Sequence, residues 1–307
     1  MFKKIVFMGT PNFAVPMLNS LYKNGCPILA VYSQPPKKSK RGQKINKSAV
    51  QIFSEKINLN IRTPNFLKNN SEELEYFKSM SPDIVIVVAY GMLIPEEFLR
   101  LAKYGFLNVH ASLLPKWRGA APVQRAIMNL DKSVGISIMK LVGKLDSGPV
   151  MFKKEINLNK ETNAEQALSK LSRIGSEIIL DCLDLIEIGK AKFIEQEHSQ
   201  ATYAKKISNA ECKIDWKEKA INIIAKINGL YPDPAAHFFF NGERYKILKA
   251  ELSDLKGDTG AILNDDLTVA CGSGSVKILE IQRQGKKVQK SKEFLLGSRM
   301  KKGSILS

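Results

Sequence analysis

The chain has 307 residues, of which 44% are hydrophobic and 25% are charged, so it is a globular protein with enough length for two domains. Lysine and arginine outnumber the acidic residues by 47 to 30, and the net charge of +17 favours a polyanionic partner. No apolar run approaches the roughly 18 residues that a membrane helix requires. Lys3 and Lys4 lead directly into a strand pattern that leaves no room for a signal peptide. We therefore expect a cytoplasmic protein without a membrane partner.

Two separated segments supply the positive charge. Residues 1–54 contain nine lysines or arginines and no acid, and residues 277–302 contain nine with only two acids. This pattern fits either a solvated surface or a surface that binds nucleic acid, and we favour nucleic acid. The four cysteines are scattered singly, and no cysteine or histidine pair has metal-ligand spacing. We therefore expect neither a disulfide framework nor a metal.

The N-terminal region alternates strands with helices. Residues 3–8 predict a buried strand, a turn follows at 9–11, a helix continues to about Tyr22, and residues 28–32 predict a second strand. This order is typical of a doubly wound, Rossmann-like α/β domain with a mostly parallel sheet. Because the first turn lacks a G-x-G-x-x-G motif, a nicotinamide or flavin dinucleotide is not expected.

The next elements continue the same pattern after a basic interruption. Residues 34–47 contain six basic residues and two prolines, which predict a long exposed loop. Helices are expected at 48–56 and from Ser71 onward, with a short strand near 60–63 between them. Residues 83–89, DIVIVVA, are an unbroken apolar run that predicts a central parallel strand covered on both faces.

The last elements of this domain carry the candidate site. They are expected strands at 105–109 and 135–141 and expected helices from Pro95, at 122–129 and at 163–188. Asn108 and His110 are two residues apart on one strand, so their side chains leave the same face. They also lie near its carboxyl end, where ligands bind in open α/β sheets. Asp146 follows a second apolar run, in a loop flanked by glycines.

The C-terminal part has a different pattern. The expected boundaries are a catalytic domain at 1–189, a polar linker at 190–208 and a smaller domain at 209–307. In the smaller domain a helix at 220–227 precedes short apolar runs separated by turn signals. Asn241-Gly242 is the strongest of these hairpin signals, and residues 272–275 read as another turn rather than a phosphate loop. We expect an OB-like β-barrel, a class that often binds nucleic acid.

An amide, an imidazole and a carboxylate together suit acyl transfer to an amine. Asn108 can donate to an oxyanion without carrying charge, His110 can manage a proton near neutral pH, and Asp146 can orient the imidazole or stabilise its cation. A structural interpretation is also open at this point. In it, Asn108 ends a strand, His110 is a half-buried histidine with its polar atoms satisfied, and Asp146 forms an Asx-turn.

The string from Asn108 to Gly119, NVHASLLPKWRG, together with LDSG at 145–148, resembles the signature of the tetrahydrofolate-dependent formyltransferases. The resemblance implies that Asn108, His110 and Asp146 are the catalytic trio and that 10-formyltetrahydrofolate is the co-substrate. It also implies which residues form the walls of the folate pocket, namely Tyr90, Gly91, Met92, Leu93, Ser112, Leu113, Leu114 and Pro115.

Other segments resemble the branch of this family that acts on methionyl-tRNA. They are the opening IVFMGTPNFAVP at 5–16, the segment at 205–216 and Gly285-Lys286-Lys287. The resemblance implies transfer of the formyl group to the α-amino group of initiator methionyl-tRNA for translation initiation, by an enzyme we expect to be a monomer. The expected tRNA contacts are Lys37, Lys38, Lys40, Arg41, Lys44, Lys286 and Lys287.

Two alternatives from other functional classes are considered. One is a folate-dependent formyltransferase for a small amine, such as a nucleotide-linked amino sugar, which would have little need for the basic loop or the barrel. The other is a non-catalytic RNA-binding protein, which would bind RNA without consuming folate.

Overall fold

The computed structural model describes residues 4–39 and 44–307, and residue contacts divide the chain into two compact units. The first unit comprises residues up to Ala120 together with Gly135–Ile156 and Leu168–Ala204. The second comprises Ala121–Val134, Asn157–Ala167 and Lys205–Ser307. Within the described ranges, no helix is long and apolar enough to cross a membrane.

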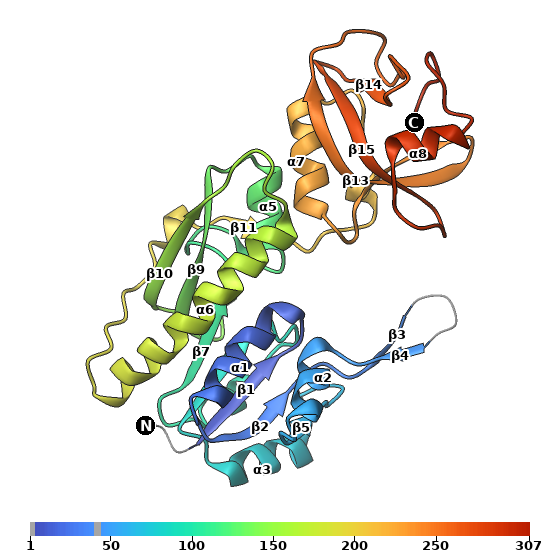
Figure 1. The fold of residues 1–307 in the computed structure, drawn as a ribbon. Helices are drawn as coiled ribbons and strands as arrows, with labels where there is room; N and C mark the ends of the chain where they lie inside the picture. Colours follow the sequence, from blue (N-terminus) through green and yellow to red (C-terminus); the bar gives the residue numbers. More distant parts are fainter. Residues whose placement is uncertain (1–3, 40–43) are drawn as a thin grey trace. The chain divides into compact units, whose positions relative to one another are not determined.

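A seven-stranded sheet forms the framework of the first unit (Figure 1). In spatial order its strands are β10 (Val150–Asn157), β9 (Ser133–Lys140), β7 (Phe106–His110), β6 (Ile84–Val88), β1 (Ile5–Gly9), β2 (Ile28–Tyr32) and β5 (Ile61–Arg62). The strands from β7 to β5 pair in parallel, and β9 joins β7 antiparallel. The predicted doubly wound, mostly parallel sheet is confirmed, and the strand predicted at 83–89 is its fully buried β6.

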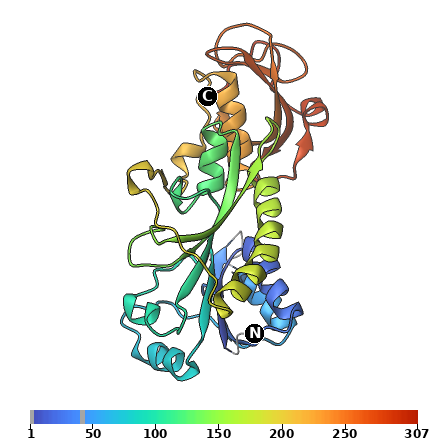
Figure 2. The same cartoon turned by 90° about the vertical axis from the view of Figure 1, so that its left-hand side faces the viewer.

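Helices cover both faces of this sheet. On one face α1 (Val15–Lys23), which follows the short 3₁₀ helix η1 (Asn12–Ala14), lies beside α6 (Ala164–Glu187) (Figures 1 and 2). The Ser20 hydroxyl donates to the Ser176 carbonyl at 2.7 Å between these two helices. On the other face, α3 (Ser71–Met80) and α4 (Glu96–Leu99) place Phe77 against Phe98, with ring centroids 5.3 Å apart. The predicted alternation of strands and helices is thereby confirmed.

A buried carboxylate ties three elements of the first unit together. Glu73 on α3 accepts a hydrogen bond from the Tyr32 hydroxyl of β2 at 2.7 Å. It also forms an ion pair with Arg62 of β5 at 2.6 Å. Burial, and secondarily the neighbouring carboxylate, raises the pKa of Tyr32, so the phenol stays protonated and keeps donating. This cluster fixes α3 against the edge of the sheet.

The basic segment at 34–47 is more ordered than expected. Residues Lys37–Ser39 form β3 and Lys44–Asn46 form β4, and the two strands pair antiparallel. The expected exposed loop therefore contains a two-stranded ribbon at these residues, where no strands were predicted. The helix predicted at 48–56 follows as α2 (Ala49–Lys56), and the Ser48 side chain caps it by accepting from the Gln51 backbone N–H.

The segment after α6 packs along the first unit up to Ala204. Ile194 forms an isolated antiparallel bridge with Val150, with backbone hydrogen bonds of 2.8 and 2.9 Å. Further along, the two-residue strand β11 (Tyr203–Ala204) pairs in parallel with β8 (Arg118–Gly119). Part of the segment expected as a linker is thus hydrogen-bonded to the rest of the first unit.

The second unit is a curled antiparallel sheet with helices around one core. Figure 2 shows α7 (Ala220–Leu230) against the strands of this unit. The strands are β12 (Ala236–Phe240), β13 (Glu243–Ser253), β15 (Ser275–Arg283) and β14 (Thr268–Ala270) in spatial order, with β16 (Gln289–Lys290) also on β15 and α8 (Ser291–Leu296) after it. This sheet agrees with the predicted small barrel-like domain. Residues 260–264, expected as a strand, form only isolated bridges, such as Ile262 to Val269.

Both predicted hairpin turns are present. Asn241 and Gly242 have φ values of 49° and 76° between β12 and β13, which a two-residue type I′ turn requires. At the other turn the Cys271 N–H donates to the Gly274 carbonyl between β14 and β15, and no helix follows.

A short helix from the middle of the chain also belongs to the second unit. This helix is α5 (Pro122–Met128), and its Arg125 forms a 2.6 Å ion pair with Glu211. On α7, a Cβ at Gly229 would lie 2.6 Å from the Met128 side chain, so the absence of a side chain lets the two helices pack closely. The core of this unit therefore includes residues from before the long helix α6.

Candidate active site

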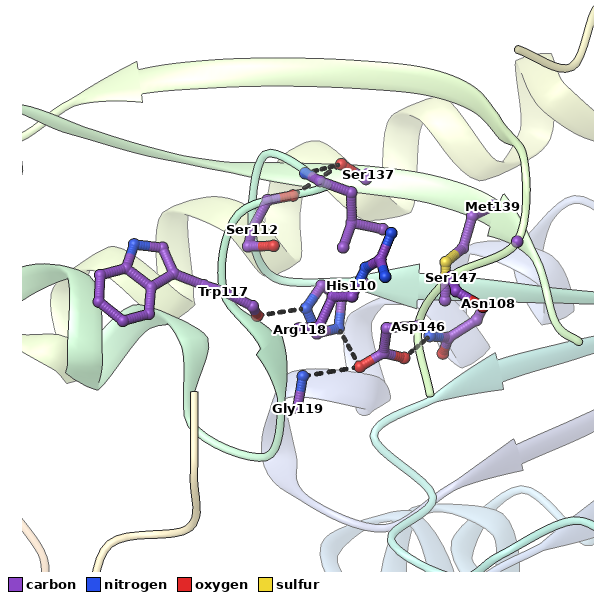
Figure 3. Close-up of polar contacts among 12 residues, drawn as sticks. Asn108, His110, Ser112, Trp117, Arg118, Gly119, Ser137, Met139, Asp146 and Ser147 are labelled. Carbon is purple, nitrogen blue, oxygen red and sulfur yellow. Dashed lines mark hydrogen bonds and ion pairs between the residues drawn. The ribbon is translucent and has the colours of Figure 1, made fainter. Parts of the chain in front are cut away.

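Two of the predicted catalytic side chains lie at the carboxyl end of β7. Asn108 and His110 are 8% and 7% exposed, and both contact Asp146 from the same face of the strand (Figure 3). The intervening Val109 is buried and paired with Ile138 of β9. The alternation of a strand therefore separates the reactive side chains from the core-facing one, as the spacing predicts.

The Asp146 carboxylate lies between Asn108, His110 and Gly119. Its Oδ1 accepts from the Asn108 amide nitrogen at 3.4 Å, and its Oδ2 accepts from the Gly119 backbone N–H at 2.8 Å. The same Oδ2 lies 3.7 Å from Nδ1 of His110. Asp146 has a φ of +44°, a left-handed conformation that aspartate tolerates better than most residues. The structure thus brings together the three residues that the sequence singled out.

The position of the proton on His110 follows from its other contact. Nε2 lies 2.9 Å from the carbonyl oxygen of Trp117, which can only accept, so Nε2 carries the hydrogen in the neutral ring. Nδ1 then has its lone pair directed to the side where Asp146 lies. In this arrangement Nδ1 is the ring nitrogen that can take up a proton.

The loop after β7 is held by a small hydrogen-bond network. The Ser137 hydroxyl of β9 donates to the Ser112 carbonyl at 2.7 Å and accepts from the Leu114 N–H at 3.1 Å. The Ser112 hydroxyl donates to the Lys116 carbonyl at 2.6 Å. Lys153 donates to the Leu114 carbonyl, and Leu114 itself is buried with Met139 and Val150. Of the expected pocket-wall residues, Leu113 and Pro115 are less buried than Ser112 and Leu114.

The turn at 90–93 divides into a buried and an exposed part. Tyr90 is only 2% exposed and belongs to the core under the sheet, and burial raises the pKa of its phenol. The Gly91 carbonyl accepts from the Gln34 side chain at 2.6 Å, and Met92 packs against the same core as Tyr90. Leu93, in contrast, is 75% exposed. Leu93 is therefore the member of this turn that offers an apolar side chain to solvent or to a ligand.

The expected tRNA-binding lysines whose side chains are described are exposed. Lys37 is exposed and donates to Gln34 at 2.7 Å, and Lys286 and Lys287 are exposed in the turn between β15 and β16. Lys40 and Arg41 lie outside the described residues, and so do the side chains of Lys38 and Lys44. Residues 205–307 contain 19 lysines or arginines and 12 acidic residues, so this part of the chain carries a net positive charge.

A polar pair behind the site was not found by sequence reasoning. Gln196 is 8% exposed and Arg118 is 4% exposed. The Gln196 side-chain amide donates to the carbonyls of Asp146 and Gly148 at 2.9 and 2.7 Å, and its oxygen accepts twice from Arg118. In the described part of the chain, no three histidine, cysteine or carboxylate side chains gather as a metal site would require.

Comparison with known families assigns the chain to a class. Residues 3–183 match the formyl transferase family, and residues 206–299 match the formyl transferase C-terminal domain. The chain belongs to the formyl transferase family. Methionyl-tRNA formyltransferase of Pelagibacter ubique (strain HTCC1062) is 57% identical over 100% of this chain and 99% of its own length. Methionyl-tRNA formyltransferase of Caldanaerobacter subterraneus subsp. tengcongensis is 40% identical, covering 99% of each.

Solved structures share the fold at low identity. HypX from Aquifex aeolicus, crystallised with tetrahydrofolic acid, superposes with a TM-score of 0.69 at 15% identity. The superposition covers 100% of this chain and 51% of the HypX chain. An N-formyltransferase from Helicobacter canadensis, in complex with folinic acid and dTDP-3-aminofucose, has a TM-score of 0.67 at 17% identity, covering 92% of this chain and 100% of its own.

Proposed function

We propose that this protein transfers the formyl group of 10-formyltetrahydrofolate to the α-amino group of initiator methionyl-tRNA, producing N-formylmethionyl-tRNA for translation initiation. The observation that carries the proposal is the position of Asp146, whose carboxylate contacts Asn108 and lies 3.7 Å from His110. Full-length similarity to methionyl-tRNA formyltransferases supports the same reaction.

Asn108 suits the oxyanion. When the amine attacks the formyl carbon, the formyl oxygen gains negative charge in a tetrahedral intermediate. The Asn108 amide has two hydrogens, of which one points to Asp146 Oδ1, so the other remains for the oxyanion. A neutral donor placed in this way stabilises the intermediate more than it stabilises the uncharged formyl group.

His110 and Asp146 suit the proton transfer. The attacking nitrogen becomes positively charged and must lose a proton, and Nδ1 of His110 can accept it because Nε2 is fixed as a donor. Asp146 at 3.7 Å then stabilises the imidazolium. The imidazolium can return the proton to the folate nitrogen as the bond between that nitrogen and the formyl carbon breaks. An α-amino group titrates near about 7.7 to 8.0, so a strong base is unnecessary.

The folate is proposed to bind between the loop at 112–115 and the turn at 90–93. The first is anchored to Ser137 by two hydrogen bonds, and the second presents the exposed Leu93. An anchored loop and an accessible apolar side chain are the features that a flat, partly aromatic co-substrate requires. We propose no metal for the reaction, since His110 and Asn108 can supply the proton transfer and the oxyanion contact.

Binding of the tRNA is assigned to the basic residues. Lys37, Lys38, Lys40, Arg41 and Lys44 in the N-terminal segment, and Lys286 and Lys287 in the C-terminal unit, would neutralise phosphates and set the register of the acceptor end. We further propose that 1–189 is the catalytic domain, 190–208 a linker and 209–307 the tRNA-binding domain. The enzyme would act as a cytoplasmic monomer.

One assay tests the proposal against its alternatives. The protein is incubated with formyl-labelled 10-formyltetrahydrofolate and charged initiator methionyl-tRNA, with uncharged initiator tRNA, charged elongator tRNA and a nucleotide-linked amino sugar as controls. Label should move to the charged initiator tRNA. Transfer to the amino sugar alone would establish the small-amine alternative, and RNA binding without transfer would establish the non-catalytic one.

A further inference from the structure

A segment outside both family matches holds the active site in place. We call residues 194–204 the strap; they lie between the match that ends at residue 183 and the one that begins at 206. The strap contacts two loops of the first unit. One contains Trp117, Arg118 and Gly119, and the other contains Asp146 and Gly148.

Gln196 is the centre of the strap. Its Nε2 donates to the backbone carbonyls of Asp146 at 2.9 Å and Gly148 at 2.7 Å, using both amide hydrogens. Its Oε1 accepts from Nε and one terminal nitrogen of Arg118, at 3.1 and 2.7 Å. The side chain is 8% exposed, so these four hydrogen bonds are made away from water, and leaving any of them unpaired is costly.

Arg118 orients the Gln196 amide. An amide can be turned over, but the Arg118 guanidinium only donates, so it requires the oxygen of Gln196 on its side. The nitrogen is then directed to the Asp146 loop. His198, also in the strap, accepts at its Nδ1 from the same terminal nitrogen of Arg118 that binds Gln196, at 2.9 Å. The Arg118 guanidinium therefore binds two side chains of the strap, Gln196 and His198.

The strap also fixes the loop on the opposite side of the catalytic carboxylate. Thr202 accepts from the Trp117 N–H through its hydroxyl at 2.8 Å and from the Arg118 N–H through its carbonyl at 2.9 Å. In the same loop, the Trp117 carbonyl accepts from Nε2 of His110. The backbone N–H of Gly119, two residues later, donates to the Asp146 carboxylate. A single segment thus sets the position of both groups that contact His110 and Asp146.

We propose that Gln196 is a positioning residue of the catalytic site, acting through Asp146. It holds the loop at 146–148 so that the Asp146 carboxylate faces Asn108, His110 and Gly119. The inference rests on the proposed formyl transfer for its kinetic consequence, but its structural consequence is independent of the reaction. Asp146 has a positive φ of +44°, a conformation that is uncommon outside glycine, and the two hydrogen bonds from Gln196 to this loop help to maintain it.

Two substitutions separate the contacts of Gln196. Gln196→Glu keeps an acceptor for Arg118 but removes both donors to the Asp146 loop, and Gln196→Met removes all four hydrogen bonds at similar volume. Both should lower kcat about 10- to 100-fold, because a small displacement of a reacting group is enough for such a loss. The KM values for folate and tRNA should stay within about twofold, since neither ligand contact is removed.

Gln200→Glu is the matched control. Gln200 lies in the same segment and is exposed, and its side chain donates to the Glu197 side chain at 2.6 Å. It should keep wild-type kcat. A Gln196→Glu variant with wild-type kcat, or a Gln200→Glu variant that loses as much, would overturn the assignment.

A second pair of measurements distinguishes positioning from general destabilisation. In an Asp146→Asn background, Gln196→Glu should lower kcat by much less than it does in the wild type, because both changes affect one unit. An undiminished effect in that background would contradict action through Asp146.

Hydrogen exchange provides the second measurement. Exchange of the peptide spanning 141–150 should accelerate in Gln196→Glu, while the sheet strands remain protected. This readout needs no turnover, so it tests the inference even if the wild type does not formylate methionyl-tRNA, and unchanged exchange would contradict it.

Discussion

Nδ1 of His110 lies 3.7 Å from Oδ2 of Asp146, a distance suited to charge stabilisation and too long for a direct hydrogen bond. Nε2 of the same ring is already committed to the carbonyl of Trp117. The neutral imidazole therefore has an available lone pair on the side where the Asp146 carboxylate lies. We propose Nδ1 as the proton acceptor, and the first prediction tests this role.

Replacing His110 with alanine should remove the proton acceptor while leaving both substrates able to bind. We expect kcat to fall about 100- to 10,000-fold, the range that general acid–base catalysis supplies. The KM for tRNA should change little, and added imidazole should restore part of the rate. The measurement is steady-state formylation of charged initiator tRNA. Wild-type turnover in His110→Ala would refute the assignment.

Replacing Asn108 with alanine tests the oxyanion role. The rate should fall about 100- to 1000-fold, as expected when one such donor is removed, and tRNA affinity should stay near wild type. Asn129→Ala is a suitable control, because the Asn129 side chain donates to the nearby Asp131 on an exposed turn. If Asn108→Ala instead raised the KM for folate at constant kcat, the residue would bind the ground state and not the intermediate.

How far the sequence predicts this site depends on the range of the contacts. Asn108 and His110 are two residues apart on a strand, so local periodicity is enough to place them on one face. Asp146 required the motif, because the loop geometry that brings it to Asn108 across 38 positions has no periodic signal. Gln196 could not be found in this way. A glutamine in a polar, irregular segment has the same local pattern whether it is solvated or buried against a loop 50 positions away.

The same reasoning explains the differences in the fold. The strands at Lys37–Ser39 and Lys44–Asn46 belong to a two-stranded ribbon without a core, so they lack the apolar alternation by which strands are recognised. The α5 helix was predicted at nearly its observed position. Its packing on Gly229 of α7, however, depends on contact between residues about a hundred positions apart, which composition does not encode.

The basic turn at Lys286 and Lys287 should contribute to tRNA binding through phosphate contacts. Reversing both charges, in Lys286→Glu with Lys287→Glu, should raise the KM for tRNA and reduce the slope of log binding constant against log salt by about 1 to 2. The KM for folate should not change. Lys256→Glu, on an exposed loop between Asp254 and Asp258, is the control. A double variant with the wild-type salt slope would remove this turn from the interface.

The ion pair between Arg125 and Glu211 should give the second unit a defined acid sensitivity. The Arg125 guanidinium, helped by Ser208, lowers the pKa of Glu211 to about 2 from its ordinary value near 4.5. A folded-state pKa below the unfolded one stabilises the protein at higher pH, and this stabilisation is lost as pH falls from about 4.5 towards 2.

Urea unfolding at several pH values tests this linkage. Arg125→Met should lower the free energy of unfolding at pH 7, and the difference from wild type should shrink as the pH approaches 3. The difference in the free energy of unfolding will be modest, because the Glu211 side chain is 38% exposed and solvent screens the ion pair. Arg100→Met, which removes a more exposed ion pair with Glu96, serves as the control. A difference that stays constant down to pH 3 would show that Arg125 acts through packing and not through Glu211.

Replacement of Gly119 should cost both stability and activity. It has a φ of +118°, and a Cβ there would lie 2.7 Å from the carbonyl oxygen of Ala204. Gly119→Ala should therefore destabilise the protein by about 3 kcal/mol or more, combining backbone strain with a clash against a fixed backbone atom.

Gly189→Ala separates these two causes. Gly189 also has a positive φ, +69°, but nothing lies within 4 Å of its Cβ position, so the loss there should be only about 1 kcal/mol. The two variants are compared by thermal unfolding and by kcat. Because the Gly119 N–H donates to Asp146 at 2.8 Å, moving that strand away from the strap also displaces the catalytic carboxylate. Gly119→Ala should accordingly lose turnover at temperatures where it is still folded, whereas Gly189→Ala should not. Equal kcat in the two variants would mean that the contact between Gly119 and Ala204 does not govern the position of Asp146.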